Sequence, residues 1–467
     1  MSKGFVIVLD FGKTLAKATL WSPGRRAVER RSRPNQRVSE DGLPRLDYAG
    51  IERWLADTLA DFARAAEIEA IIPVGHGASG CIVDGDRLAL APLDYEAEPP
   101  ADIRRKYLAL RDDFGVTGSP CLPMGLNLGT QLFWLQSAQP REFARGRILT
   151  WPQYWAWRLC GVEATEVTSL GCHTDLWMPI EKRPSPLAMA QGWAARFAPL
   201  RKASDVLGTI GEEWSQRTGL ARSCKVLCGI HDSNAALLAT RLHPEIGNRE
   251  CTVMSTGTWF IAMRTLASAA DSPVLSEGRD CLFNVDAGGN PVPSSRFMGG
   301  REAELLEEAE GAFVDVAGNA GALLSLAEQM VAFGVYALPT FEAGVGPYPR
   351  NTGRWIGRPD DRLARRAVAG LYLALMADRA LELIGARIRI VIEGRFGGDP
   401  VFTRALASLR AGDSLYLSDA QDNLALGALS LLDGEIPAQV ELSRVEPLEF
   451  DIAAYAKCWR EMAEAAE

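Results

Sequence analysis

The sequence predicts an α/β protein made of two related domains. Three observations lead to this expectation: the chain has 467 residues, short apolar strands repeatedly run into glycine turns, and one strand–turn–strand pattern recurs in each half. A chain of this length is too long for one ordinary hydrophobic core. We expect domains at residues 1–244 and 245–467, because His243-Pro244 and Gly247-Asn248 interrupt the chain there.

The first half opens with a predicted hairpin. Residues 5–9 and 15–21 are apolar runs on either side of the turn Gly12-Lys13-Thr14. Helices are expected at 51–66, 131–137 and 152–159, with a strand at 70–74. A later strand at 225–228 leads into Gly229-Ile230-His231-Asp232 and a helix at 235–240. Four tryptophans are expected in the core rather than in a sugar-stacking surface: Trp134, Trp151, Trp155 and Trp157.

The second half repeats the opening pattern. Strands are expected at 251–254 and 260–263, on either side of Thr256-Gly257-Thr258. A helix is expected to start within 297–302, and residues 341–353 are rich in glycine and proline, which is typical of a surface loop. The longest amphipathic helix is expected at 362–384. A buried strand at 388–392 then leads into the glycine-rich segment 394–399, followed by a helix at 401–409.

Composition excludes several classes of protein. The chain is 47% apolar and 23% charged, as in globular proteins, and its formal net charge of −9 argues against nucleic acid as the main partner. No apolar run reaches the ~18 residues of a membrane span, and a strand follows the N-terminus at once, so neither a membrane partner nor a signal peptide is expected. Nine scattered cysteines are typical of reduced thiols and predict a cytoplasmic protein.

The glycine turns are suited to binding a nucleotide. Gly12 and Gly257 would let the backbone approach phosphate oxygens, Lys13 would add a charge, and Thr14, Thr256 and Thr258 would add hydroxyl donors. The late loop, with Gly394, Gly397, Gly398 and Asp399, would place backbone amides near an adenosine. Taken singly, the turns at Gly12 and Gly257 are more often ordinary hairpin turns than phosphate sites.

Two aspartates follow buried strands and are candidates for the chemistry of phosphoryl transfer. Asp10 is suited to a magnesium ion, although aspartates in such places also cap their own turns. Asp232 is suited to act as the base for a hydroxyl group, although it also fits the N-cap of the helix that follows. His231 beside it would hydrogen-bond a substrate hydroxyl or serve a structural role.

These motifs together resemble the FGGY family of carbohydrate kinases, within the actin-like ATPase superfamily, from Asp10 to about Leu432. Asp10-Phe11-Gly12-Lys13-Thr14 with Lys17 is similar to the family's first phosphate turn, with Lys13 in place of threonine. Gly229-Ile230-His231-Asp232 is similar to the segment of its catalytic aspartate, and Thr256-Gly257-Thr258-Trp259 to its second phosphate turn. In the late loop Arg395 and Phe396 interrupt the family's glycines, and Asp399 stands in place of asparagine.

The resemblance implies two actin-like (ribonuclease H-like) domains with the active site in the cleft between them, and ATP and Mg²⁺ as cofactors. The His-Asp pair and the Thr-Gly-Thr-Trp turn look most like the rhamnulokinase and fuculokinase branch. By similarity, the sugar would contact five residues: Gly80, Asp94, His231, Asp232 and Asn284.

The expected activity is therefore ATP-dependent phosphorylation of a primary hydroxyl of a sugar, such as L-fuculose or L-rhamnulose at the 1-hydroxyl. A kinase for a pentulose of the xylulose or ribulose type remains an alternative. An actin-like nucleotide-binding protein without sugar chemistry is another, and a homodimer is one assembly that the sequence leaves open.

Overall fold

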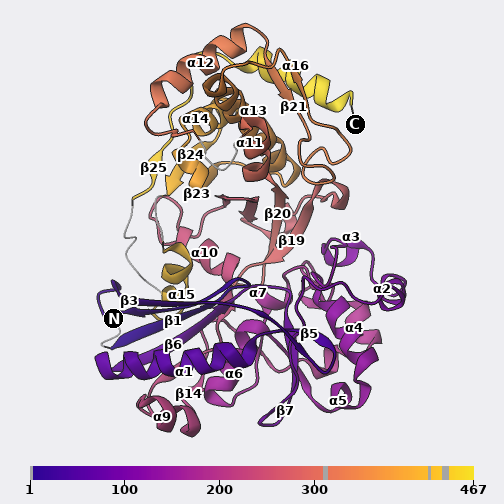
Figure 1. The fold of residues 1–467 in the computed structure, drawn as a ribbon, viewed down its shortest axis with the longest axis vertical. Coiled ribbons are helices and arrows are strands. Elements are labelled where there is room, and N and C mark those ends of the chain that lie inside the picture. Colours follow the sequence, from indigo (N-terminus) through magenta and orange to yellow (C-terminus); the bar gives the residue numbers. More distant parts are fainter. Residues whose placement is uncertain (1–3, 309–313, 419–421, 434–440, 467) are drawn as a thin grey trace. The chain divides into compact units, whose positions relative to one another are not determined.

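The computed structural model describes residues 4–308, 314–418, 422–433 and 441–466, which form two compact units that each contain a seven-stranded mixed sheet (Figure 1). The first unit comprises Met1–Leu242, Phe283–Pro291 and Asp422–Pro437. The second comprises His243–Leu282, Val292–Gln421 and Ala438–Glu467. The predicted α/β class is confirmed.

The sheet of the first unit has the strand order β14-β15-β6-β1-β2-β3, with β16 also paired to β6. β1 pairs in parallel with β6 and antiparallel with β2, so the hairpin predicted at the start of the chain is present. The strands are β1 (Phe5–Phe11), β2 (Leu15–Trp21), β3 (Ala27–Pro34), β6 (Ile68–Gly75), β14 (Val206–Thr209), β15 (Lys225–Leu227) and β16 (Ile230–His231).

Alternate side chains of β1 point to opposite faces of this sheet and are apolar on both, so helices cover both faces. Ile7, Leu9 and Phe11 pack with α1 (Tyr48–Ala65), α6 (Trp151–Cys160) and α9 (Glu212–Thr218). Val6 and Val8 pack with α10 (Asp232–Thr240) and α15 (Asn423–Asp433). Figure 1 shows the gold α15 beside α10, although about 180 residues separate them in the chain.

A smaller three-stranded sheet, β8-β7-β9, and several short elements complete the first unit. Their bounds are β4 (Arg37–Glu40), β5 (Leu43–Leu46), β7 (Gly80–Asp84), β8 (Arg87–Leu90), β9 (Arg147–Thr150), β10 (Thr165–Glu166), β11 (Trp177–Met178), β12 (Arg183–Pro184), β13 (Leu200–Arg201), α2 (Ala101–Leu108), α3 (Phe114–Thr117), α4 (Leu128–Ala138), α5 (Pro140–Arg145), α7 (Val167–Leu170) and α8 (Pro186–Ala190). The four tryptophans predicted for the core are all buried.

The sheet of the second unit has the order β19-β20-β18-β17-β23-β24-β25, in which β17, β23 and β24 are parallel. Its strands are β17 (Cys251–Thr256), β18 (Phe260–Thr265), β19 (Cys281–Val285), β20 (Pro291–Phe297), β23 (Arg389–Gly394), β24 (Ser414–Ser418) and β25 (Ser443–Arg444). The β17–β18 hairpin has the same plan as β1–β2, as the recurrence in the sequence predicted.

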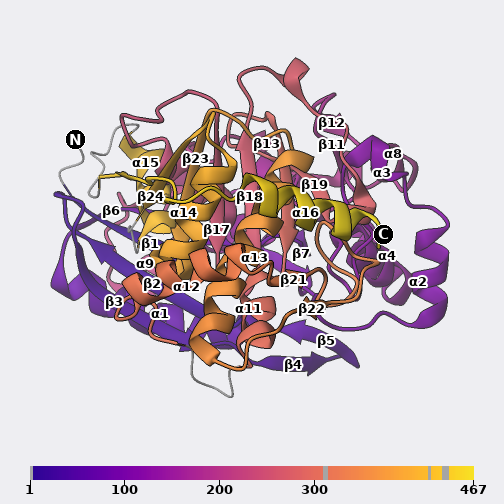
Figure 2. The same cartoon turned by 90° about the horizontal axis from the view of Figure 1, so that it is seen from above.

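The main core of the second unit lies between one face of this sheet and a group of helices, which Figure 2 shows from above. These helices are α11 (Gly299–Glu307), α12 (Ala320–Ala332), α13 (Arg362–Leu383), α14 (Pro400–Leu409) and α16 (Ala453–Glu464), with the small hairpin β21 (Tyr336–Leu338) and β22 (Arg354–Ile356). The long helix expected at 362–384 is α13. No helix in the described part of the chain has both the length and the apolar character needed to cross a membrane.

Candidate functional site

The β1–β2 turn carries the first group of predicted site residues. Asp10 lies next to the end of β1, opposite Lys17 in the hairpin register, and its Oδ2 is 3.3 Å from the Lys17 Nζ. Asn35 holds the turn with two hydrogen bonds: its Nδ2 donates to the Gly12 carbonyl at 2.8 Å, and its backbone N–H donates to the Thr14 carbonyl at 2.8 Å. The Thr14 side of this turn is exposed.

Asp232 is the first residue of α10, directly after β16. Its Oδ1 accepts from the backbone N–H of Ser233 at 2.5 Å and from the Ser233 hydroxyl at 3.2 Å, and the side chain is 29% exposed. Burial raises the pKa of Asp232, while His76 and Lys17 lower it. A carboxylate with a raised pKa is a stronger base than an ordinary aspartate, as proton abstraction from an alcohol requires.

His231 contacts the same carboxylate. Its Nε2 lies 3.1 Å from the Asp232 Oδ1 and 3.4 Å from the Cys172 Sγ, and Asn234 Nδ2 is 3.2 Å from its Nδ1. Burial lowers the pKa of His231 to about 4, so the ring is neutral at pH 7. With Asn234 donating to Nδ1, the proton lies on Nε2 and points to Asp232 and Cys172.

His76 interacts electrostatically with Asp232 and His231, although it is not among the predicted site residues. It follows β6, is 8% exposed, and its Nδ1 lies 2.8 Å from the Gly77 carbonyl, whereas its Nε2 is buried without a hydrogen-bond partner. Burial lowers the pKa of His76 to about 4, and Asp232 acts electrostatically on it. The signal in the sequence was a polar residue between two glycines at the end of a buried strand, Gly75-His76-Gly77.

A buried carboxylate supports the segment that carries His231. Glu166, fully buried, is the N-cap of α7 and accepts from the Thr168 backbone N–H at 3.0 Å and the Thr168 hydroxyl at 2.5 Å. The Thr168 hydroxyl oxygen in turn accepts from the His231 backbone N–H at 3.1 Å. Gln153 holds the preceding residues by donating to the carbonyls of Cys228 and Gly229 at 3.1 and 3.2 Å.

We expect Glu166→Gln to change how stability depends on pH. Burial raises the pKa of Glu166 to about 7 from 4.5, so its stabilising contribution is complete below pH 4.5 and is lost as the pH rises through 7. This loss amounts to about 3 kcal/mol of unfolding free energy. Glutamine does not titrate, so the loss of unfolding free energy between pH 5 and pH 8, measured in urea, should be smaller in the variant than in the wild type by most of this amount. Glu212→Gln, at an exposed glutamate, should behave like the wild type; equal pH dependence of all three proteins would refute the assignment.

The residues predicted to bind sugar lie in different surroundings. Gly80 begins β7, where a side chain would meet the Leu149 carbonyl and Leu128, so this position requires glycine for close packing. Asp94 is almost fully buried and forms an ion pair with Lys13. Asn284 is buried within β19. His231 thus contacts Asp232, whose charge acts on Asp10 and His76, and Lys13 pairs with Asp94.

In the second unit, Thr256 connects the β17–β18 turn with the late glycine loop. Its hydroxyl donates to the Glu393 carbonyl at 2.6 Å and accepts from the Phe396 backbone N–H at 3.1 Å. Gly394 has a φ of +90°, and a Cβ there would clash with the Thr256 carbonyl oxygen. The Thr256 side chain therefore holds the two turns together, and Thr258 is the exposed threonine of this pair.

The late loop presents open backbone at Gly397 and Gly398, where an added Cβ would meet nothing within 4 Å. Asp399 ends the loop as the N-cap of α14: its Oδ1 accepts from the backbone N–H groups of Val401 and Phe402 at 3.0 and 3.1 Å, and its Oδ2 pairs with Arg366. Both carboxylate oxygens are thus directed into the protein. The Asp-Pro sequence before an apolar helix was the local signal for this cap.

The donor set near Asp10 fits a magnesium ion that keeps its water and phosphate ligands. No group of three or more His, Cys, Asp or Glu side chains in the described ranges forms a complete protein metal site. Burial raises the pKa of Asp10, Lys17 lowers it, and the nearby Asp232 raises it. The negative charge of Asp232 disfavours the charged form of Asp10, and a bound cation would offset this effect.

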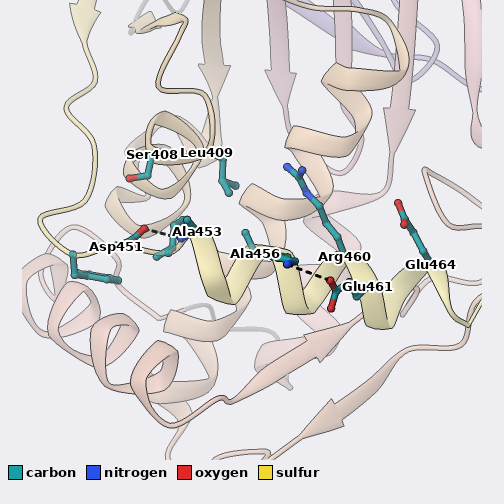
Figure 3. A pocket seen from close by; sticks show the side chains of 11 residues that line it. Ser408, Leu409, Asp451, Ala453, Ala456, Arg460, Glu461 and Glu464 are labelled. Carbon is teal, nitrogen blue, oxygen red and sulfur yellow. Dashed lines mark hydrogen bonds and ion pairs between the residues drawn. The ribbon is translucent and has the colours of Figure 1, made fainter.

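A separate hollow of about 400 Å³ lies in the second unit between the C-terminal end of α14 and α16 (Figure 3). Charged side chains of α16, including Arg460, Glu461 and Glu464, line it, and Asp451 caps the first turn of α16 by accepting from the Ala453 N–H at 2.8 Å. None of the predicted site residues lines this hollow.

Comparisons with known proteins identify the family of this chain. Residues 248–440 match the family model "Carbohydrate kinase FGGY, C-terminal domain". A solved structure of a carbohydrate kinase from Novosphingobium aromaticivorans is 48% identical, with a TM-score of 0.95 and coverage of 100% of both chains. The chain belongs to the FGGY family of carbohydrate kinases. No curated protein matches it.

More distant structures share the fold of this FGGY kinase. A ligand-bound xylulose kinase from Lactobacillus acidophilus is 13% identical with a TM-score of 0.76, covering 99% of this chain and 96% of its own. A glycerol kinase from Plasmodium falciparum, solved with ADP, is 11% identical with a TM-score of 0.76, covering 99% and 98%. The family membership favours sugar chemistry over a nucleotide-binding protein without it.

Proposed function

We propose that this FGGY kinase transfers the γ-phosphoryl group of ATP to a primary hydroxyl of a ketose, such as the 1-hydroxyl of L-fuculose or L-rhamnulose. The observation that carries the proposal is the Asp232 carboxylate: it begins a helix after a buried strand, its pKa is raised by burial, and the neutral His231 lies 3.1 Å from it.

In this mechanism Asp232 accepts the proton of the sugar hydroxyl while the hydroxyl oxygen attacks the γ-phosphorus and ADP leaves. His231 and His76, both neutral, orient the sugar: the unpaired Nε2 of His76 is available to a hydroxyl group. Phosphoryl transfer requires positioning and charge stabilisation more than covalent chemistry from the protein.

The phosphate contacts are assigned to the glycine turns. The backbone around Gly12, with Thr14, and the turn at Gly257 and Thr258 would bind phosphate oxygens, and the open backbone at Gly397 and Gly398 would lie along the nucleotide. Thr256, Gly394 and Asp399 would shape these loops. Magnesium, held through Asp10, would supply positive charge to the phosphates.

The sugar is identified by a coupled assay of ATP consumption. We expect L-fuculose or L-rhamnulose to give a kcat/KM at least tenfold above that of L-xylulose, D-ribulose, D-xylulose, gluconate and glycerol, since one mismatched hydroxyl contact costs orders of magnitude. Product analysis by ³¹P NMR should locate the phosphate on the terminal primary carbon. A preference for a pentulose would support the alternative substrate class. If none of these compounds stimulated ATP consumption, the proposal would be contradicted.

A further inference from the structure

An ionic cluster in the first unit connects the β1–β2 turn to the segment after β8. Lys13 Nζ pairs with the Asp94 Oδ1 and lies 3.8 Å from the Glu96 Oε2. Arg37, the first residue of β4, places its Nε 2.9 Å from the Asp94 Oδ2 and pairs with Glu96. The side chain of Asp94 is only 1% exposed. Two cations and two carboxylates therefore balance each other.

The acceptor capacity of Asp94 is largely used within this cluster. Oδ1 accepts from the Glu96 backbone N–H at 3.0 Å in addition to Lys13, and Oδ2 is enclosed and faces Arg37. A carboxylate offers about four acceptor sites. A sugar hydroxyl would have to displace a cation to reach either oxygen, so direct sugar binding by Asp94 is disfavoured.

The ammonium group of Lys13 also has partners within the protein. Besides its ion pair, it lies 5.0 Å from the centre of the Tyr95 ring, a cation–π distance. The Tyr95 ring in turn meets His76 edge-on, with ring centres 5.0 Å apart. His76 interacts electrostatically with Asp232. Lys13 thus contacts Tyr95, Tyr95 contacts His76, and the charge of Asp232, the proposed base, acts on His76.

We propose that Lys13 is a positioning residue for the sugar site and not a phosphate ligand. Its ion pair with Asp94 fastens residues 94–96 to the β1–β2 turn and so fixes Tyr95 against His76. Threonine, the residue of the resembling motif, is too short to make this contact and carries no charge. The inference rests on the proposed function, because it assumes that His76 and Asp232 face the sugar.

The test measures how residue 13 affects the two substrates separately. Lys13→Met removes the charge and keeps the length, and we expect the KM of the best sugar to rise about tenfold while the KM of ATP stays within about twofold. Lys13→Arg should restore the sugar KM to near the wild-type value. Lys106→Met, which breaks the exposed pair between Lys106 and Asp102 at 3.1 Å, is the matched control and should change neither constant.

The partner residue supplies a second test. Asp94→Asn should also raise the sugar KM, and the double variant Lys13→Met/Asp94→Asn should be no worse than either single variant, because an unpaired buried charge is more harmful than a missing pair. Additive losses in the double variant would contradict the coupling.

Two results for Lys13→Met would overturn the inference. A rise of tenfold or more in the KM of ATP for Lys13→Met, with the sugar KM unchanged, would make Lys13 a phosphate ligand and overturn the inference, as would no change in either. If the wild type phosphorylates no sugar, the proposed function fails by itself. Titration of the wild type and Lys13→Met with a non-hydrolysable ATP analogue by calorimetry still decides whether Lys13 binds phosphate, with equal affinities expected.

Discussion

Replacing Asp232 with asparagine should lower kcat by at least two orders of magnitude and leave the protein folded. Asparagine cannot accept the proton of the sugar hydroxyl, and a positioned base contributes roughly 10²–10⁴-fold to such a step. The amide oxygen can still accept from the backbone N–H and hydroxyl of Ser233, which now bond Oδ1, so the start of α10 should persist. Removing a carboxylate whose pKa is raised by burial also removes a desolvation cost.

The measurement combines steady-state turnover with ADP binding and circular dichroism. Asp361→Asn is a suitable control, because Asp361 also begins a helix, accepting from the Ala364 N–H at 2.8 Å at the N-cap of α13. We expect the control to retain wild-type turnover. Near-normal turnover of Asp232→Asn would remove this residue from the mechanism.

Replacing Gly394 with alanine should destabilise the second unit by about 3 kcal/mol and abolish nucleotide binding. Its φ of +90° lies in a region that residues with a side chain avoid, at a cost of roughly 1–3 kcal/mol, and the added Cβ would clash with the Thr256 carbonyl. Relief of this clash must move β17 away from the loop, and the Thr256 hydroxyl would lose its contacts with Glu393 and Phe396.

Gly397→Ala in the same loop is the matched control for stability. Its Cβ would meet nothing within 4 Å and its φ is not positive, so the free energy of unfolding in urea should change by less than about 0.5 kcal/mol. Similar losses of stability in the two variants would show that the loop tolerates no side chain anywhere, and would contradict the specific role of residue 394.

The parts of the fold that the sequence predicted are those with local signals. The two hairpins, α13 and the buried tryptophans follow from apolar periodicity and turn residues within short windows. The position of α15 on α10 could not be predicted in this way, because it depends on packing between residues 423–433 and 232–240. The small sheet of β7, β8 and β9 was missed for the same reason, since β9 joins β7 from more than 60 residues away.

The residues of the candidate site likewise divide into those with a local signal in the sequence and those without one. Asp10 and Asp232 were identified because each follows an apolar strand, and the structure relates them electrostatically. His76 had a local signal that was overlooked. The ion pair of Lys13 with Asp94 had none, because 81 residues separate the two charges. Burial decides the rest: it lowers the pKa of His231 and raises that of Asp232, and no local pattern encodes it.

The dependence of the first unit on α15 has a consequence for synthesis of the chain. Val6, Val8 and the apolar side of α10 are completed by Leu426, Ala428 and Leu429, which leave the ribosome only after more than nine-tenths of the protein has been made. Gly427 packs directly on the Ala235 carbonyl, so this closure needs a close fit. The nascent N-terminal unit therefore exposes an apolar surface through most of translation. A truncation before residue 422 would leave that surface permanently exposed and would promote aggregation.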